Sequence, residues 1–272
     1  MPIDIPTVQM TMAKPAGSNA VLDIDPAVVI AARQAAILAR PSLLFYGDAS
    51  TFQVTGGKVT GWNSRVGANA YAQATAGKQP DHRTALGPNG KAWAEFSGTA
   101  DTSGDLMMPN FAARAVNLPL TVVDILMTDT IASNRYMDGQ AGTSPDAIVG
   151  QVVATGGGNI RQQWGNAIAE RPMVAGQWKT VVRSYDGAGA VEIDTHGIKV
   201  TATATGFPTT PRLLTLGSIS GGNATGLWDG GFAFRAVFTE FIGADRAFFR
   251  ELGDFLALPE LYALPENPVA AA

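Results

Sequence analysis

Short runs of alternating apolar and polar residues recur along the chain from Leu43 onward. Such alternation, with a period of two, is typical of β-strands that bury one face. Gly, Asn, Asp and Pro, which favour tight turns, separate the runs. The pattern predicts about ten strands without intervening helices, for which an all-β, two-sheet antiparallel sandwich is the natural arrangement. The predicted strands span residues 58–62, 92–96, 120–128, 147–154, 160–164, 178–185, 190–194, 198–205, 213–218 and 232–241.

The segment before these strands has a different pattern. Residues 1–24 alternate only weakly and predict an extended arm. Asp25 is a suitable N-cap and Pro26 fits a first helical position, so residues 27–40, which are rich in helix formers, predict a helix that Pro41 ends. Because few residues of this helix are polar, it either packs on the sandwich or, together with the arm, attaches the chain to another subunit.

These boundaries divide the chain into three parts. Residues 1–42 are predicted to be an arm and helix for attachment or oligomerisation, residues 43–258 a sandwich, and residues 259–272 a C-terminal tail. A short second helix is predicted over residues 243–255, directly after the last strand. No internal repeat or linker splits the sandwich further.

Composition narrows the function classes. Of the 272 residues, 46% are hydrophobic and only 15% are charged, so a substantial core can be buried and a disordered chain is excluded. A net charge of −4 gives no basic field for a phosphate backbone, which argues against nucleic acid as a partner. The absence of cysteine excludes disulfides and thiolate chemistry. Neither a secretory signal nor a membrane-inserting segment is predicted.

Several motifs occur in the order expected for one family. Phe45–Ala49 resembles an opening strand, Val59–Gly67 a tryptophan-centred turn, and Gly90–Asp101 a "G-x-x-x-x-x-F-D-G-x-x-D" motif. Gln177–Gly187 and Leu227–Ala233 match later strands. In this order the motifs resemble the laminin-G-like, concanavalin-A-like lectin and glucanase superfamily, in the form found in bacteriophage tail and virion proteins. The resemblance implies a jelly-roll sandwich.

The resemblance also implies a function. We expect a non-enzymatic virion protein, made in the bacterial cytoplasm, whose sandwich contacts host-surface carbohydrate. Residues 1–40 would then contact other virion subunits, and the protein would form a homo-oligomer. One alternative is a purely structural decoration or tail subunit without glycan binding. The fold also hosts enzymes, so function has to be argued from the site.

Two carboxylates, Glu192 and Asp194, alternate on one predicted strand and favour a second alternative, a polysaccharide-cleaving glycoside hydrolase. Concanavalin-like glucanases carry a third carboxylate further along this strand, where His196 stands here. The other interpretation is a structural hairpin. In that hairpin Val191 and Ile193 face inward, while the two carboxylates face solvent.

Calcium is the one cofactor that the sequence suggests. Asp101 and Asp105 lie in a predicted loop and carry the hard oxygen ligands that calcium prefers. The alternative is that both are solvated turn residues. No other cofactor is predicted.

Sugar binding requires exposed aromatic rings with polar groups beside them. Trp164, with Arg161 and Asn166 nearby, and Tyr136, next to Arg135, have such polar surroundings and are the predicted carbohydrate-binding residues. The remaining tryptophans, which occupy positions typical of the family's core, are predicted to be packing residues: Trp62, Trp93, Trp178 and Trp228.

Overall fold

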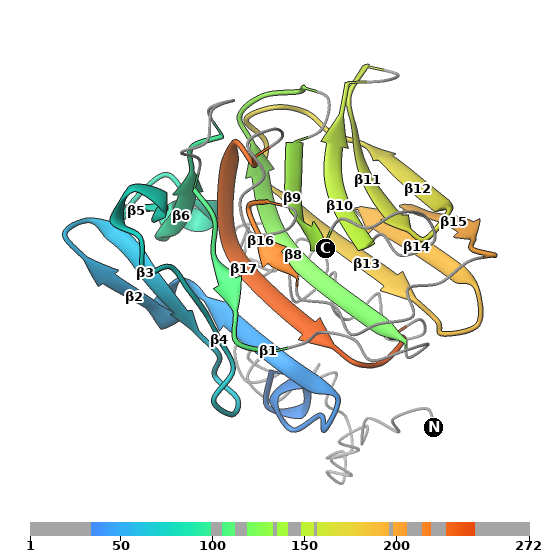
Figure 1. Ribbon diagram of the computed structural model, residues 1–272, viewed down its shortest axis with the longest axis horizontal. Helices are drawn as coiled ribbons and strands as arrows, with labels where there is room; N and C mark the ends of the chain where they lie inside the picture. Colours follow the sequence, from blue (N-terminus) through green and yellow to red (C-terminus); the bar gives the residue numbers. More distant parts are fainter. Residues whose placement is uncertain are drawn as a thin grey trace, which may run out of the picture.

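Two antiparallel β-sheets pack face to face in the computed structural model (Figure 1). The structure describes residues 34–98, 105–111, 119–132, 135–140, 148–154, 157–195, 198–205, 214–218 and 227–242. This arrangement confirms the predicted all-β sandwich. Within the described residues, no helix is long and apolar enough to cross a membrane.

The larger sheet has 12 strands and the smaller has five. The larger contains β1 (Leu43–Asp48), β2 (Phe52–Thr55), β3 (Lys58–Asn63), β4 (Ala70–Ala72), β5 (Asp81–Arg83), β6 (Trp93–Phe96), β7 (Met108–Pro109), β8 (Leu120–Thr128), β13 (Lys179–Tyr185), β14 (Ala190–Thr195), β15 (Ile198–Thr203) and β17 (Gly230–Phe238). The smaller contains β9 (Arg135–Gln140), β10 (Ile148–Val153), β11 (Asn159–Trp164), β12 (Ala167–Pro172) and β16 (Thr215–Leu216). Three short 3-10 helices, η1 (Ala49–Thr51), η2 (Ala76–Lys78) and η3 (Pro88–Gly90), join strands of the larger sheet.

Alternation along each strand separates an inner face from an outer face. The main hydrophobic core contains residues of both sheets and therefore lies between them, whereas a second core lies on the outer face of the larger sheet. On β14, Val191 and Ile193 belong to the main core, as predicted for the hairpin. Glu192 and Asp194 point the other way but are only 5% and 6% exposed, so the prediction that they face solvent is wrong.

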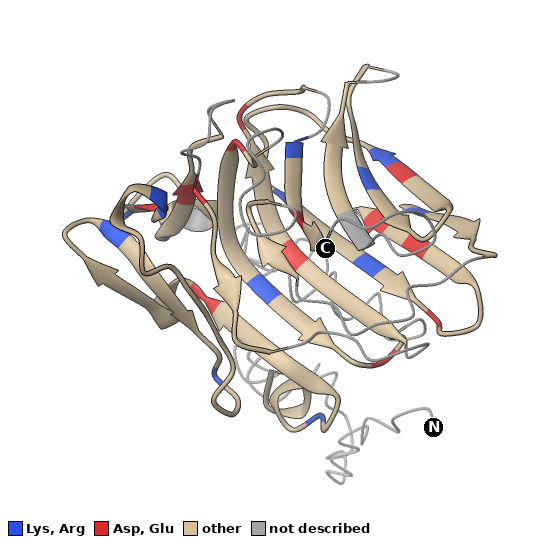
Figure 2. Ribbon diagram, in the orientation of Figure 1, with Lys and Arg blue, Asp and Glu red and all other residues tan. Residues whose placement is uncertain are grey.

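Four charged side chains lie inside the sandwich. Arg183 on β13 donates to Asp124 on β8 (2.7 Å) and to both oxygens of Asp138 on β9 (2.8 and 2.6 Å). Arg235 on β17 donates to Asp124 at 2.7 and 3.1 Å and also to Asp138. Figure 2 shows acidic and basic residues at mid-strand positions of the sheets. These buried charges, which we call the inner quartet, join the two sheets.

The quartet keeps its charges because each is paired. Burial alone raises the pKa of the Asp138 carboxyl, but the guanidinium groups of Arg183 and Arg235 outweigh burial and lower it. The two arginines and two aspartates sum to zero charge, and Gln162 accepts a further hydrogen bond from Arg183 at 2.9 Å. Paired in this way, the charges are tolerated in a low-dielectric interior.

The end of the predicted N-terminal helix is present, since residues 34–38 are helical. Ile37 packs into the second core, and Gln34 donates to the Tyr46 hydroxyl at 2.9 Å. This contact agrees with a helix that packs on the sandwich. The arm and the predicted helix over residues 243–255 lie outside the described residues, so attachment through residues 1–40 stays a prediction.

Candidate functional site

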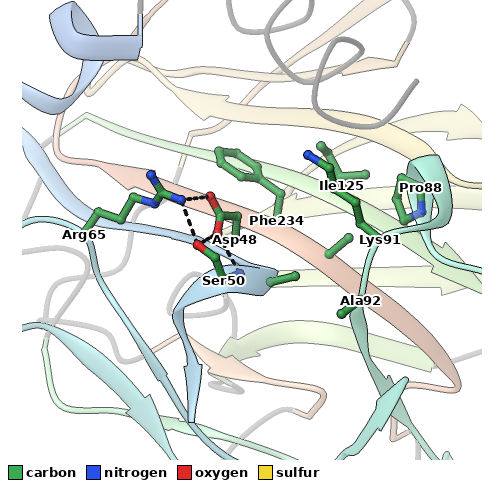
Figure 3. A pocket seen from close by; sticks show the side chains of 10 residues that line it. Asp48, Ser50, Arg65, Pro88, Lys91, Ala92, Ile125 and Phe234 are labelled. Carbon is green, nitrogen blue, oxygen red and sulfur yellow. Dashed lines mark hydrogen bonds and ion pairs between the residues drawn. The ribbon is translucent and has the colours of Figure 1, made fainter. Parts of the chain in front are cut away.

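A pocket of about 370 Å³ opens on the outer face of the larger sheet (Figure 3). Its floor is apolar and comes from Ile125 on β8 and from Ala233 and Phe234 on β17. A bulge in β17 between Phe232 and Phe234 shifts the register against β8. Ala233 and Phe234 consequently both belong to the outer side, which widens the apolar floor.

One wall of the pocket is a fixed polar group. Asp48 caps the start of η1 by accepting from the Ser50 backbone N–H at 2.9 Å, and it also accepts from the Ser50 hydroxyl at 2.6 Å. Arg65 pairs with Asp48 at 2.7 Å and donates to the Ser50 hydroxyl at 2.8 Å. The wall is therefore held in place before any ligand arrives, which lowers the entropic cost of binding.

The opposite wall carries Lys91, whose side chain extends into the pocket from the side facing Asp48 (Figure 3). Its backbone is positioned by η3, which starts at Pro88, and by the close approach of Gly87. A Cβ at Gly87 would lie 2.2 Å from the Lys91 carbonyl oxygen, so only glycine fits there. Within the described part of the chain, the Lys91 ammonium has no ion pair.

An aromatic pair lies beside the pocket on the same face. The rings of Trp93 on β6 and Trp178, just before β13, meet edge to face at a centroid distance of 5.4 Å. They close over Gly231, where a Cβ would come within 2.5 Å of Trp93 and 2.7 Å of Trp178. Trp178 is half-buried and belongs to the outer side, so it offers the ring that a sugar can stack on.

Carboxylates follow the aromatic pair toward the end of β8. Asp129 is exposed directly after β8, and its backbone N–H donates to the Asp229 carbonyl at 2.9 Å. Partial burial raises the pKa of Asp129, and the nearby carboxylates of Asp229 and Glu95 raise it further. Asp229 itself accepts from the Thr130 hydroxyl at 2.9 Å. Neighbouring carboxylates whose environments differ are the arrangement that glycosidases use as acid and base.

Trp164 does not lie where the sequence predicted. It is 1% exposed and stacks on Tyr185 in the main core, with centroids 5.0 Å apart and an interplanar angle of 19°. Its ring therefore has no face open to a sugar, and this correction follows from the inward parity of β11. Arg135 donates to the carbonyls of Gly98 and Leu227, and therefore connects loops.

The other predicted sugar-binding residues are divided between two places on the smaller sheet. Tyr136 and Arg161 both pair with Gln151, one on each side, and so share a cross-strand row. Arg161 is held by Glu170, with Nε 2.5 Å from Oε1. Asn166 lies in the turn after β11 and bonds Thr205 through both its amide nitrogen (2.6 Å) and its amide oxygen (3.0 Å). Carbohydrate binding by these residues stays a prediction.

The predicted calcium ligands are not brought together among the described residues. Asp101 lies outside them. Asp105 is 6% exposed and accepts from the Ser97 backbone N–H at 2.8 Å, and burial raises its pKa to about 6. The part of the chain that the structure describes contains no group of three or more metal-ligating side chains. Calcium binding therefore stays a prediction.

The alternative catalytic pair on β14 is largely engaged. Glu192 accepts from the Lys199 ammonium at 2.9 Å and from the Thr201 hydroxyl at 3.2 Å, both on β15. Asp194 lies on the same face two residues later and is also buried. The alternation that the sequence predicted is present.

The sequence does not predict two residues of this site. Trp178 is predicted to be a packing residue, and it does pack against the second core, on the outer side where it shares strand parity with Thr180 and Val182. Lys91 carries no motif, and only the fold brings it opposite Asp48. Strand parity could have placed Trp178 on the outer face, whereas no sequence pattern could have placed Lys91 at the pocket.

Comparison with known proteins agrees with the fold of the chain. No protein-family model matches the chain, and no curated protein matches it in sequence. An arabinofuranosidase complexed with arabinofuranosyl-α-1,2-xylobiose is similar over 74% of this chain and 50% of that one, with a TM-score of 0.53 and 16% identity. A mutant Trypanosoma rangeli sialidase displaying trans-sialidase activity is similar over 78% of this chain and 33% of that one, with a TM-score of 0.51 and 11% identity. The chain thus spans half or less of these proteins.

These neighbours correct the functional prediction. The two neighbours are an arabinofuranosidase and a sialidase, and their names give no link to a phage. The expectation of a non-enzymatic virion protein is therefore wrong, and the alternative of a glycoside hydrolase agrees better with the neighbours. At such low sequence identity, the likeness to these structures establishes the fold alone.

Proposed function

We propose that this chain is a carbohydrate-active domain of the glycoside-hydrolase kind, which binds a glycan along the outer face of the larger sheet and cleaves it there. The observation that carries the proposal is the succession of three features on that face. A pocket with a fixed polar wall is followed by a half-exposed aromatic ring, and that ring is followed by neighbouring carboxylates.

Strand geometry sets the scale of this face. Ile125 in the pocket floor and Asp129 at the carboxylates are four residues apart along β8. At a rise of about 3.4 Å per residue they lie about 14 Å apart, which several linked sugar rings can span. The site therefore suits an oligosaccharide rather than a single sugar.

Each residue has a distinct role in the proposal. Asp48 and Arg65 bind sugar hydroxyls in the pocket, and Trp178 stacks on a ring. Asp129, whose pKa is raised, holds the proton that is delivered to the leaving oxygen. Asp229, which accepts a hydrogen bond from the Thr130 hydroxyl, is the base or nucleophile.

The test is release of new reducing ends from a panel of plant and bacterial polysaccharides. We expect activity in the wild-type chain, and a loss on the order of 10²- to 10⁴-fold in Asp129→Asn and Asp229→Asn. Glu170→Gln, on the outer face of the smaller sheet, is the matched control and should keep full activity.

The β14 pair provides the competing assignment. If Glu192→Gln abolishes cleavage while Asp129→Asn and Asp229→Asn retain it, hydrolysis stands but its catalytic residues lie on β14. If the wild-type chain releases no reducing ends from any substrate, the hydrolase proposal is wrong.

A further inference from the structure

The charges of the pocket do not cancel. Asp48, Arg65 and Lys91 are its charged residues, and together they leave one positive charge. Both carboxylate oxygens of Asp48 are engaged within its own wall, because one accepts two hydrogen bonds from Ser50 and the other pairs with Arg65. It therefore does not neutralise Lys91.

The surroundings strengthen the attraction of this charge for an anion. Ile125, Ala233 and Phe234 give the pocket a low-dielectric floor. A charge beside an apolar wall acts more strongly on a ligand than the same charge in open water. Arg65 uses only its Nη2 nitrogen in the described contacts, so its other nitrogens remain free to donate to the oxygens of a ligand.

We infer that the pocket accepts a sugar that carries a carboxylate, as a uronic acid residue does, with the carboxylate on Lys91 and the hydroxyls on the Asp48–Ser50–Arg65 wall. This inference rests on the proposed function, since it names the substrate class of the same glycan site. Lys91 faces the Asp48–Ser50–Arg65 wall across the pocket (Figure 3), so its ammonium pairs with the carboxylate while Arg65 donates to the sugar hydroxyls.

The experiment measures equilibrium binding by calorimetry for oligosaccharides of pectate, alginate and hyaluronan. Each acidic ligand is compared with its own carboxyl-reduced form, which has the same length and linkage but no charge. For at least one of the three we expect the acid to bind about fivefold to tenfold more tightly, as a partly exposed charge pair allows. The preference should weaken with added salt.

Lys91→Met should remove that preference and leave binding of the reduced form within about twofold. Lys78→Met removes the same charge outside the pocket and should keep the preference, because Lys78 does not line it. An oligosaccharide that carries a sulfate ester but no carboxylate tests whether the pocket prefers sulfate as its anion. If it binds more tightly than every carboxylated ligand, the carboxylate assignment is overturned.

The outcomes separate the two proposals. If acid and reduced form bind alike, or if Lys91→Met keeps the preference, the inference is wrong while glycan binding still supports the proposed function. If no acidic, reduced or neutral glycan binds, both are wrong.

Discussion

Arg183 on β13 and Asp138 on β9 meet through two hydrogen bonds, of 2.8 and 2.6 Å, in the middle of the sandwich. They belong to different sheets, so this pair connects the two layers across the core. Arg235 and Asp124 complete the inner quartet around it. The quartet is thus a polar connection within the interior of the sandwich.

Removing one member of the quartet should strongly destabilise the fold. Asp138→Ala leaves an excess positive charge buried between the sheets, and we expect a loss of about 3–5 kcal/mol in the free energy of unfolding. Urea denaturation measures it. Glu170→Ala breaks a partly exposed ion pair instead and should lose less than about 1 kcal/mol. Equal losses of unfolding free energy in both variants would show that the quartet stabilises the fold no more than a partly exposed ion pair does.

Asp105 should make stability depend on pH. Its pKa is raised by burial from 3.8 to about 6, so the folded state prefers the protonated carboxyl. Its stabilising contribution, on the order of 3 kcal/mol, is present below about pH 4 and is lost as the pH rises through 6. Asp105→Asn, which keeps an acceptor for the Ser97 N–H, should flatten this part of the curve. If the free energy of unfolding varies with pH in the same way in both proteins from pH 4 to 7, Asp105 is not the group responsible.

Trp178 should contribute to glycan affinity with little effect on folding. Its half-buried ring stacks on a sugar in our proposal, so Trp178→Ala should weaken binding by up to about tenfold. Trp178→Phe retains an aromatic face and should recover most of the affinity. Calorimetric titration with the best ligand measures both. Unchanged affinity in the alanine variant would remove Trp178 from the site.

Trp164 should behave in the opposite way. Because it is buried against Tyr185, Trp164→Ala leaves a cavity and should lower the free energy of unfolding by about 3–5 kcal/mol. In the fraction that remains folded, glycan affinity should match that of the wild type. Urea denaturation and calorimetry together check this. A stable variant with lost affinity would restore Trp164 as a sugar-binding residue.

The pH profile of cleavage should report Asp129. Its protonated form is the active acid in our proposal, so activity falls as the pH rises through its pKa. Glu95 raises that pKa, and Glu95→Gln should therefore move the alkaline limb of the profile to lower pH. Asp81→Asn, on the neighbouring strand β5, is the control. If the alkaline limb of the pH profile does not move in Glu95→Gln, Asp129 is not the acid.

Sequence alone predicted the sandwich, the β14 hairpin and the inward parity of Val191 and Ile193, because alternation is a local property of a strand. The sequence places Trp164 on the surface because its neighbours Arg161 and Gln163 are polar. In the fold these two side chains point to the opposite face of β11. Gln162, which is polar, faces inward with Trp164, so the polar run 161–163 hides the alternation between the two faces.

The inner quartet and the pocket were not predictable in this way. Asp124 stands in the apolar run 120–128, and its partners Arg183 and Arg235 are distant in sequence. The pocket likewise assembles Asp48, Lys91 and Phe234 from three separate strands or turns. Contacts of this kind arise from the order of strands in a sheet, which no local pattern contains.

The inner quartet also bears on folding fidelity. A strand that slips by one residue turns every side chain to the opposite face. A slip of β8 would move Asp124 out of the interior and leave the two guanidinium groups facing Asp138 alone. Misaligned sheets would therefore carry an unbalanced buried charge, which disfavours them relative to the native register.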